Sequence, residues 1–183
     1  MLKKFRAAAL IFASAISLTS CASKIDNTDA YKIAANYDAD AIKEKYSDGT
    51  YKVTGKVSEA DGTVFQSIAQ IIWKGLGIEE DFEVGKSVSV TEDSSNLIYI
   101  TEASAKAMDS SGYQEFHWYK KGNALGYTAV STTGSGSSQV TTKSEVWYTS
   151  EGLLDTSKVE ANAQDGENKL SLSFTEKYTW NKK

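Results

Sequence analysis

Apolar side chains in residues 29–46 recur at three- and four-residue spacing, which is the period of an α-helix with one buried face. Ile33, Tyr37 and Ala41 mark this face, and Asn27, Thr28 or Asp29 is available as the capping residue. The pattern therefore predicts an amphipathic helix at the start of the folded part of the chain.

A second helical pattern runs through residues 61–77, opened by Asp61 as a cap and closed by Gly75 or Gly77. Its apolar positions form a broad stripe, and we expect this stripe to pack in the core rather than bind a partner. The stripe consists of Val64, Ile68, Ile71, Ile72 and Leu76.

Alternation of apolar and polar residues predicts strands on either side of this second helix. Residues 51–57 follow the turn signal Ser47-Asp48-Gly49, and two further strands are expected at residues 87–91 and 97–101. Strand, helix and strand in this order are typical of a β-α-β crossover.

The C-terminal half consists of long β segments joined by turn residues. Gly122-Asn123 and Asp165-Gly166 are turns of the kind that close hairpins, and residues 133–138 are expected to form a mobile Gly/Ser loop tip. The expected strands are 113–121, 124–132, 140–149, 158–163 and 170–180. We therefore predict an α+β domain with two N-terminal helices packed on a twisted antiparallel sheet, whose C-terminal half is a meander.

The N-terminus resembles a bacterial lipoprotein signal peptide. Basic residues are followed by an apolar run over residues 7–18 and then by Leu18-Thr19-Ser20-Cys21, which resembles a lipobox. The resemblance implies export, removal of residues 1–20 and acylation of Cys21. An ordinary secretory signal that leaves Cys21 as a free thiol is the alternative.

On this interpretation, residues 21–28 are the lipidated cysteine and a short tether, and residues 29–183 are a single globular domain. Several acyl chains on Cys21 would hold the protein durably in a membrane. Ala22 follows the cysteine instead of an aspartate, so we expect the outer membrane of the bacterial envelope.

Charge argues against a nucleic-acid partner. The chain has 20 Lys and Arg against 24 Asp and Glu, and removal of Lys3, Lys4 and Arg6 leaves 17 against 24, a formal charge of −7. Arg6 is the only arginine and Cys21 the only cysteine. Removal of Arg6 with the signal peptide would leave no guanidinium group to bind phosphate. Acylation of Cys21 would leave no thiol for a disulfide or a thiolate metal site in the mature chain.

Candidate catalytic chemistry is sparse. His117 is the only histidine, with Glu115 on the same side of its strand, but a structural histidine is the simpler interpretation. Ser135 lies between two glycines without the Gly-x-Ser-x-Gly pattern of a nucleophile elbow. The acidic residues from Glu79 to Glu83 lack the ligand spacing of a calcium loop. We expect no enzymatic activity, no metal and no cofactor.

Aromatic residues in the meander define a candidate ligand surface. Core packing is the first interpretation of the tryptophans, and the alternative is that the strands carrying three of them line one concave apolar surface. Glu176 interrupts the apolar face of the last strand, where it either contacts a ligand or marks the emergence of the face into solvent. The candidate binding residues are Trp118, Trp147, Phe174, Glu176 and Trp180.

Residues 51–107 resemble the N-terminal cap region of bacterial BspA-like leucine-rich-repeat surface proteins. The similarity rests on residues 51–61, on Ile68-Ala69 and on residues 94–100, and it implies an envelope protein. No leucine-rich repeats follow Ala107, which argues against adhesion through a repeat surface.

The strand count and aromatic content also resemble lipocalin-like β-barrels, our alternative fold. We therefore expect a non-enzymatic envelope lipoprotein that binds a protein partner or supports envelope structure. A carrier of a small apolar ligand or lipid is the alternative function.

Overall fold

The computed structural model describes residues 22–183, which form an eight-stranded antiparallel sheet and four helices. Cys21 and the predicted signal peptide lie outside the described residues. The strands are β1 (Ser23–Ile25), β2 (Tyr46–Ala60), β3 (Ser87–Ser94), β4 (Glu115–Lys121), β5 (Ala124–Ser135), β6 (Ser138–Tyr148), β7 (Leu154–Asp165) and β8 (Asn168–Lys182). The helices are α1 (Asn27–Ala35), α2 (Ala39–Lys45), α3 (Gly62–Gly75) and α4 (Glu102–Asp109).

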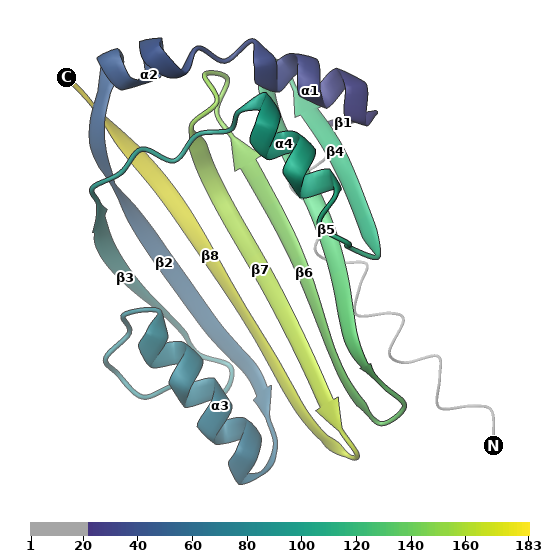
Figure 1. The fold of residues 1–183 in the computed structure, drawn as a ribbon. Coiled ribbons are helices and arrows are strands. Elements are labelled where there is room, and N and C mark those ends of the chain that lie inside the picture. The colour runs from purple at the N-terminus through teal and green to yellow at the C-terminus, as the bar shows by residue number, and fades with distance from the viewer. Residues whose placement is uncertain (1–21) are drawn as a thin grey trace.

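The sheet is open, with strand order β1-β4-β5-β6-β7-β8-β2-β3 (Figure 1). Strands β4 to β8 are consecutive neighbours, which confirms the predicted meander. Because β1 and β3 lie at opposite ends of the order, the sheet does not close, and the lipocalin-like barrel is wrong. The predicted β-α-β crossover is also wrong, because β2 and β3 are adjacent and antiparallel.

Tight turns determine the register of the meander. Gly122-Asn123 joins β4 to β5 as predicted, and Lys121 pairs with Ala124. The expected mobile tip at residues 133–138 is instead the end of a long hairpin, in which Ser135 pairs directly with Ser138. Gly136, with φ at 62°, supplies the left-handed conformation in this turn.

The helix predicted over residues 29–46 is two helices. The Asp38 side chain accepts hydrogen bonds from the backbone N–H groups of Asp40 and Ala41, so a new helix begins at Ala39. The expected turn Ser47-Asp48-Gly49 lies within β2. Gly49 permits a close strand approach there, because a Cβ atom would lie 2.4 Å from the carbonyl oxygen of Thr179.

The segment expected to be a tether belongs largely to the folded structure. Ser23 pairs with Lys120 and Ile25 with Trp118, so β1 forms one edge of the sheet. Asp26 then caps α1 by accepting a hydrogen bond from the N–H of Asp29. The folded domain thus includes most of residues 22–28, with Ala22 alone preceding β1.

The strand predicted at residues 97–101 is reduced to an isolated bridge between Tyr99 and Leu153. Thr101 instead caps α4, a helix that the sequence analysis did not predict. Its side chain accepts from the N–H of Ser104, whose hydroxyl accepts from the N–H of Thr101 in return.

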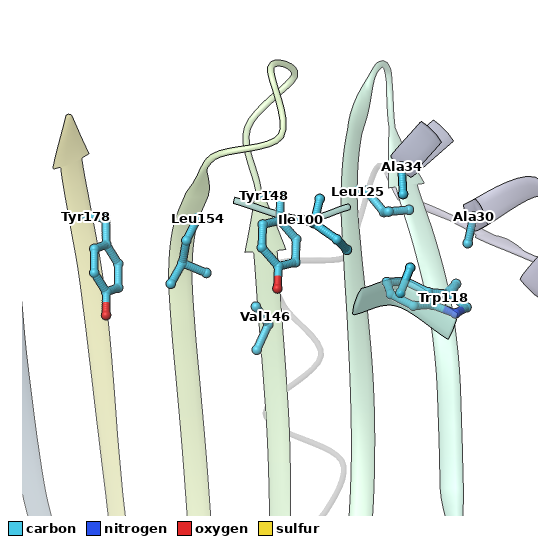
Figure 2. Close-up of a cluster of buried hydrophobic side chains, with 10 residues drawn as sticks. Ala30, Ala34, Ile100, Trp118, Leu125, Val146, Tyr148, Leu154 and Tyr178 are labelled. Atoms are coloured by element: carbon cyan, nitrogen blue, oxygen red, sulfur yellow. The ribbon is translucent and has the colours of Figure 1, made fainter. Parts of the chain in front are cut away.

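Two hydrophobic clusters lie on one face of the sheet, which we call the inner face. The α1–α4 cluster joins these helices to β4–β8, and Figure 2 shows Tyr178, Leu154, Tyr148 and Trp118 across neighbouring strands. The α3 cluster covers the other end of β2 and β8, where Trp73 and Ala69 pack near Val57 and Leu172. The opposite face, which we call the outer face, carries the alternate residues of each strand.

Candidate interaction surface

Helix α3 leaves part of its apolar side uncovered. Trp73 and Ala69 are buried against the sheet, but Val64, Ile68 and Ile71 are 68%, 37% and 72% exposed. The prediction that the whole apolar stripe packs in the core is therefore wrong for these three residues. We call them the α3 stripe.

The α3 stripe is continuous because its members are spaced i, i+4 and i+7 along the helix. At about 100° per residue, its centre lies about a third of a turn from the buried side of α3. Isolated apolar residues are common on protein surfaces, whereas contiguous ones indicate an interaction site.

The other flank of α3 is polar and is already occupied by the connection to β3. Gln70 Nε2 donates to Asp81 Oδ1 at 3.1 Å, and Lys74 Nζ lies 3.7 Å from the same oxygen. A hollow of about 490 Å³ lies here, open to solvent. Its lining residues are Thr63, Gln66, Ser67, Gln70, Asp81 and Phe82. The α3 stripe lies on the flank of the helix away from this connection.

The candidate ligand residues do not surround one cavity. Trp118 is 0% exposed in the α1–α4 cluster, so its ring is sealed from any ligand in this structure. Trp180 packs against the same cluster and donates its Nε1 hydrogen to the carbonyl of Leu154 at 2.7 Å. Phe174 packs against the α3 cluster at the other end of the strand.

Trp147 lies on the outer face, away from the other candidates. It pairs with Gly126, whereas Trp118 pairs with Tyr127 and Tyr127 with Val146. Paired residues share a face of the sheet and successive residues alternate, so Trp118 and Trp147 lie on opposite faces. The structure thus does not form the single concave surface with three tryptophans that the sequence suggested.

Glu176 lies between the two clusters on the inner face, half-buried in the row of Val53 and Ser157. It accepts a hydrogen bond from the hydroxyl of Tyr178 at 3.0 Å. Burial first, and the neighbouring Glu176 carboxylate second, raise the pKa of Tyr178 above its ordinary value. Glu176 lines neither of the two best-defined hollows in residues 22–183.

The outer face carries charges on β6 and β7. Lys158 Nζ lies 2.7 Å from Glu160, and Glu145 accepts from Trp147 Nε1 at 2.9 Å. The hollow between these side chains and Lys143 has a volume of about 10 Å³, too small for anything larger than a water molecule.

His117 is also on the outer face, where its Nε2 atom is 3.5 Å from Lys24 Nζ. Ser135 pairs with Ser138 at the far end of the β5–β6 hairpin. The structure therefore does not bring these two residues together. Within residues 22–183, no three His, Cys, Asp or Glu side chains are grouped so that they could hold a metal ion. No helix in the same range is long and apolar enough to cross a bilayer.

Comparison of the chain with models of protein families, with curated proteins and with solved structures found no match.

The α3 stripe is the feature whose exposure the sequence analysis missed. Its residues were recognised as one apolar side of a helix, but sequence alone does not say how much of that side the sheet covers. The sequence feature that indicates this exposure is the width of the apolar side of the helix, which exceeds what one buried face needs. A buried face is already complete without the stripe, and it consists of Phe65, Ala69, Ile72, Trp73 and Leu76.

Proposed function

We propose that the chain is a non-enzymatic lipoprotein of the bacterial envelope that binds a protein partner through the α3 stripe. The observation that carries the proposal is the exposure of Val64, Ile68 and Ile71 on a helix that already packs a separate apolar side against the sheet. Covering such a row removes apolar surface from water, the main driving force for protein association.

The lipid anchor rests on the lipobox Leu18-Thr19-Ser20-Cys21. Because β1 begins at Ser23, Ala22 would be the only residue between the acylated cysteine and the sheet. The corner of the domain that contains Ser23 and its partner Lys120 would then lie against the membrane.

The position of α3 favours a protein over a lipid surface as the occupant of the stripe. Ser23 pairs near the end of β4 that leads into the Gly122-Asn123 turn. Helix α3 follows Ala60, at the opposite end of the strands and near the other edge of the sheet (Figure 1). An anchor at one corner would thus hold the α3 stripe away from the membrane.

The negative charge of the domain indicates the kind of partner surface that we expect. The mature chain would carry a formal charge of −7, and Glu79, Glu80 and Glu83 are exposed in the connection after α3. We expect a protein that places apolar side chains on the α3 stripe and that has a basic rim.

A carrier of a small apolar ligand would need an enclosed apolar volume. Neither of the two best-defined hollows in residues 22–183 is an enclosed apolar cavity, because one is open to solvent and the other holds at most water. We therefore place the carrier function second and treat a stoichiometrically bound lipid as a contrary result of the test below.

The test uses a photo-activated cross-linking side chain at Ile71 of the full chain in bacterial cells. We expect one protein adduct, whose purified component then binds the chain in solution. Val64→Gln together with Ile68→Gln should weaken this binding by about tenfold or more, because two apolar contacts are lost. Ser67→Ala together with Gln66→Ala is the matched control on the polar flank.

Three results would overturn the proposal. They are an adduct with lipid, equal binding by the stripe and control variants, and native mass spectrometry that finds a stoichiometric small molecule on the protein. Labelled fatty acid should be incorporated by the wild-type chain but not by Cys21→Ala, which tests the anchor separately.

A further inference from the structure

The β3 strand forms a free edge of the sheet. Its only strand neighbour is β2. Among residues 22–183, no hydrogen bond from a loop, helix or side chain reaches the backbone of residues 88–93. Every second residue of this strand thus presents an N–H and a C=O group outward.

Only Glu92 and Asp93, near the end of β3, supply the charges that usually discourage strand addition. Its pairing with β2 runs from Gly49 and Ser94 to Lys56 and Ser87 without a bulge. The chain contains no proline, and residues 87–91 carry no charge. The β1 edge differs, because it is only three residues long.

We propose that β3 pairs antiparallel with β3 of a second copy of this chain, with Ser89 on the two-fold axis. In a sheet that continues across the axis, opposite residues share a face. Each residue must therefore lie opposite another of the same parity.

Centring the pair on Ser89 places Val88 opposite Val90 and Lys86, the residue before β3, opposite Glu92, twice in each dimer. Lys86 Nζ lies 3.2 Å from Glu83 in the single chain, so its side chain would exchange that exposed contact for Glu92. Apolar side chains then meet apolar ones, and opposite charges meet. A centre at Val90 would instead place Val88 opposite Glu92. A centre at Val88 would place Lys86, the residue before β3, opposite Val90, a charge against an apolar side chain. The sequence is therefore self-complementary in one of these three neighbouring registers.

The dimer would complete the cover of β3. Val88 and Val90 are half-buried beside Phe82 in the α3 cluster, and the second copy would remove more of their surface from water. The α3 stripe faces away from the α3–β3 connection and would remain open. Self-association and partner binding would thus use separate surfaces.

The arrangement is compatible with two lipid anchors, a step that rests on the proposed function. A two-fold axis perpendicular to the sheet places both Ser23 residues at the same height along that axis. Both anchors could then enter one membrane, with the axis along the membrane normal and the outer face of the sheet toward the lipid, so that α3 on the inner face stays on the side away from the membrane.

Cysteine cross-linking in membranes tests the register with the full chain. Directly opposite residues have Cα atoms about 4.5 to 5.5 Å apart, within the range of a disulfide. Ser89→Cys should therefore form a covalent dimer under mild oxidation. Ser89 is exposed on the outer face, where its hydroxyl lies 2.8 Å from that of Thr54, so the substitution is mild.

Two control variants test whether the cross-link is specific to the β3 edge and to the proposed register. Thr179→Cys is exposed on the outer face within the sheet and should remain monomeric. Thr91→Cys should not link to itself, because its copies lie about 13 Å apart in this register, but it should link to Ser87→Cys in a co-expressed mixture.

Charge reversal provides a second measurement. Lys86→Glu places like charges opposite each other and should reduce the Ser89→Cys dimer fraction by about fivefold or more, since two pairs change in each dimer. Adding Glu92→Lys should restore the fraction. These changes leave the β2–β3 backbone pairing in place.

A monomeric Ser89→Cys variant, or a Thr91→Cys variant that links to itself, would overturn the proposed pairing. A wild-type chain that links through Cys21 would show instead that this cysteine is not acylated, a failure of the anchor alone. The stripe variants should leave the Ser89→Cys cross-link unchanged, which separates the two proposals.

Discussion

The ring of Tyr37 lies directly against the backbone of Gly152. A Cβ atom at Gly152 would be 2.6 Å from Cγ of Tyr37, and the glycine has a φ of 89°. The Tyr37 hydroxyl also donates to the carbonyl of Asn123 at 2.7 Å. One tyrosine between α1 and α2 therefore contacts both the β6–β7 connection and the β4–β5 turn.

Gly152→Ala should lower the free energy of unfolding by about 2 to 4 kcal/mol, because the methyl group both strains the backbone and displaces the Tyr37 ring. Gly136→Ala is the matched control, with φ at 62° and no atom within 4 Å of the added carbon. It should cost only about 1 kcal/mol, the conformational part. Equal losses in urea unfolding would show that the Tyr37 contact contributes nothing.

Stability should fall between pH 10 and pH 12. Burial raises the pKa of Tyr37 to about 12. Burial also raises that of Tyr31 to about 12, with contributions from the hydrogen bond and charge of Asp109. An unfolded tyrosine has a pKa of about 10, so this stabilisation is complete below pH 10 and is lost as the pH rises through 12.

Tyr37→Phe removes one of these titrations. It should cost about 1 kcal/mol at pH 7 through the lost hydrogen bond, yet lose less stability than the wild type between pH 10 and pH 12. Denaturant unfolding across this pH range measures both effects. A wild-type curve that stays flat to pH 12 would contradict the assignment.

The meander was predictable because its signals are local. Two-residue turns at Gly122-Asn123 and after Asp165 fix the pairing of their flanking strands, and alternation identifies the strands themselves. The β5–β6 hairpin shows the limit. Treating residues 133–138 as a loop left the register open, and only a turn at residues 136–137 places Trp147 opposite Gly126.

The errors near the N-terminus have a different cause, because tertiary contacts override local signals there. The residues Ser47-Asp48-Gly49 are typical of a turn, but in the structure Gly49 lies within β2 and its missing side chain lets β8 approach closely. The α3 stripe was assigned to the core because periodicity reports which residues share a side of a helix. It does not report that α3 lies near the edge of a sheet that covers only part of that side.

Asp109 should matter chiefly for the attachment of α1 to α4. Its Oδ2 atom accepts from Asn27 Nδ2 at 2.6 Å and from the Tyr31 hydroxyl at 2.7 Å. Asp109→Ala should cost about 1 to 2 kcal/mol, since both bonds involve a charged acceptor but lie near the surface.

Hydrogen exchange gives the regional measurement for Asp109→Ala. The amides of α1 should exchange faster in this variant, while those of β7 and β8 keep their protection. Glu44→Ala, which removes a negative charge from an exposed position on α2, is the control and should leave α1 unchanged. Uniform acceleration across the sheet would show instead that α1 does not open independently.

Trp118 and Trp147 provide a direct test of which face holds the core. Trp118 is 0% exposed, and its Nε1 has no hydrogen-bond partner within residues 22–183, so its contribution comes from packing. Trp118→Ala should cost about 3 to 5 kcal/mol. Trp147 is half-buried over Gly126, and Trp147→Ala should cost about 1 to 2 kcal/mol, because less apolar area returns to water. Thermal unfolding of the two variants measures the difference in stability loss. A larger loss for Trp147→Ala than for Trp118→Ala would mean that the register of the β5–β6 hairpin is incorrect. The assignment of the inner face would then be incorrect as well.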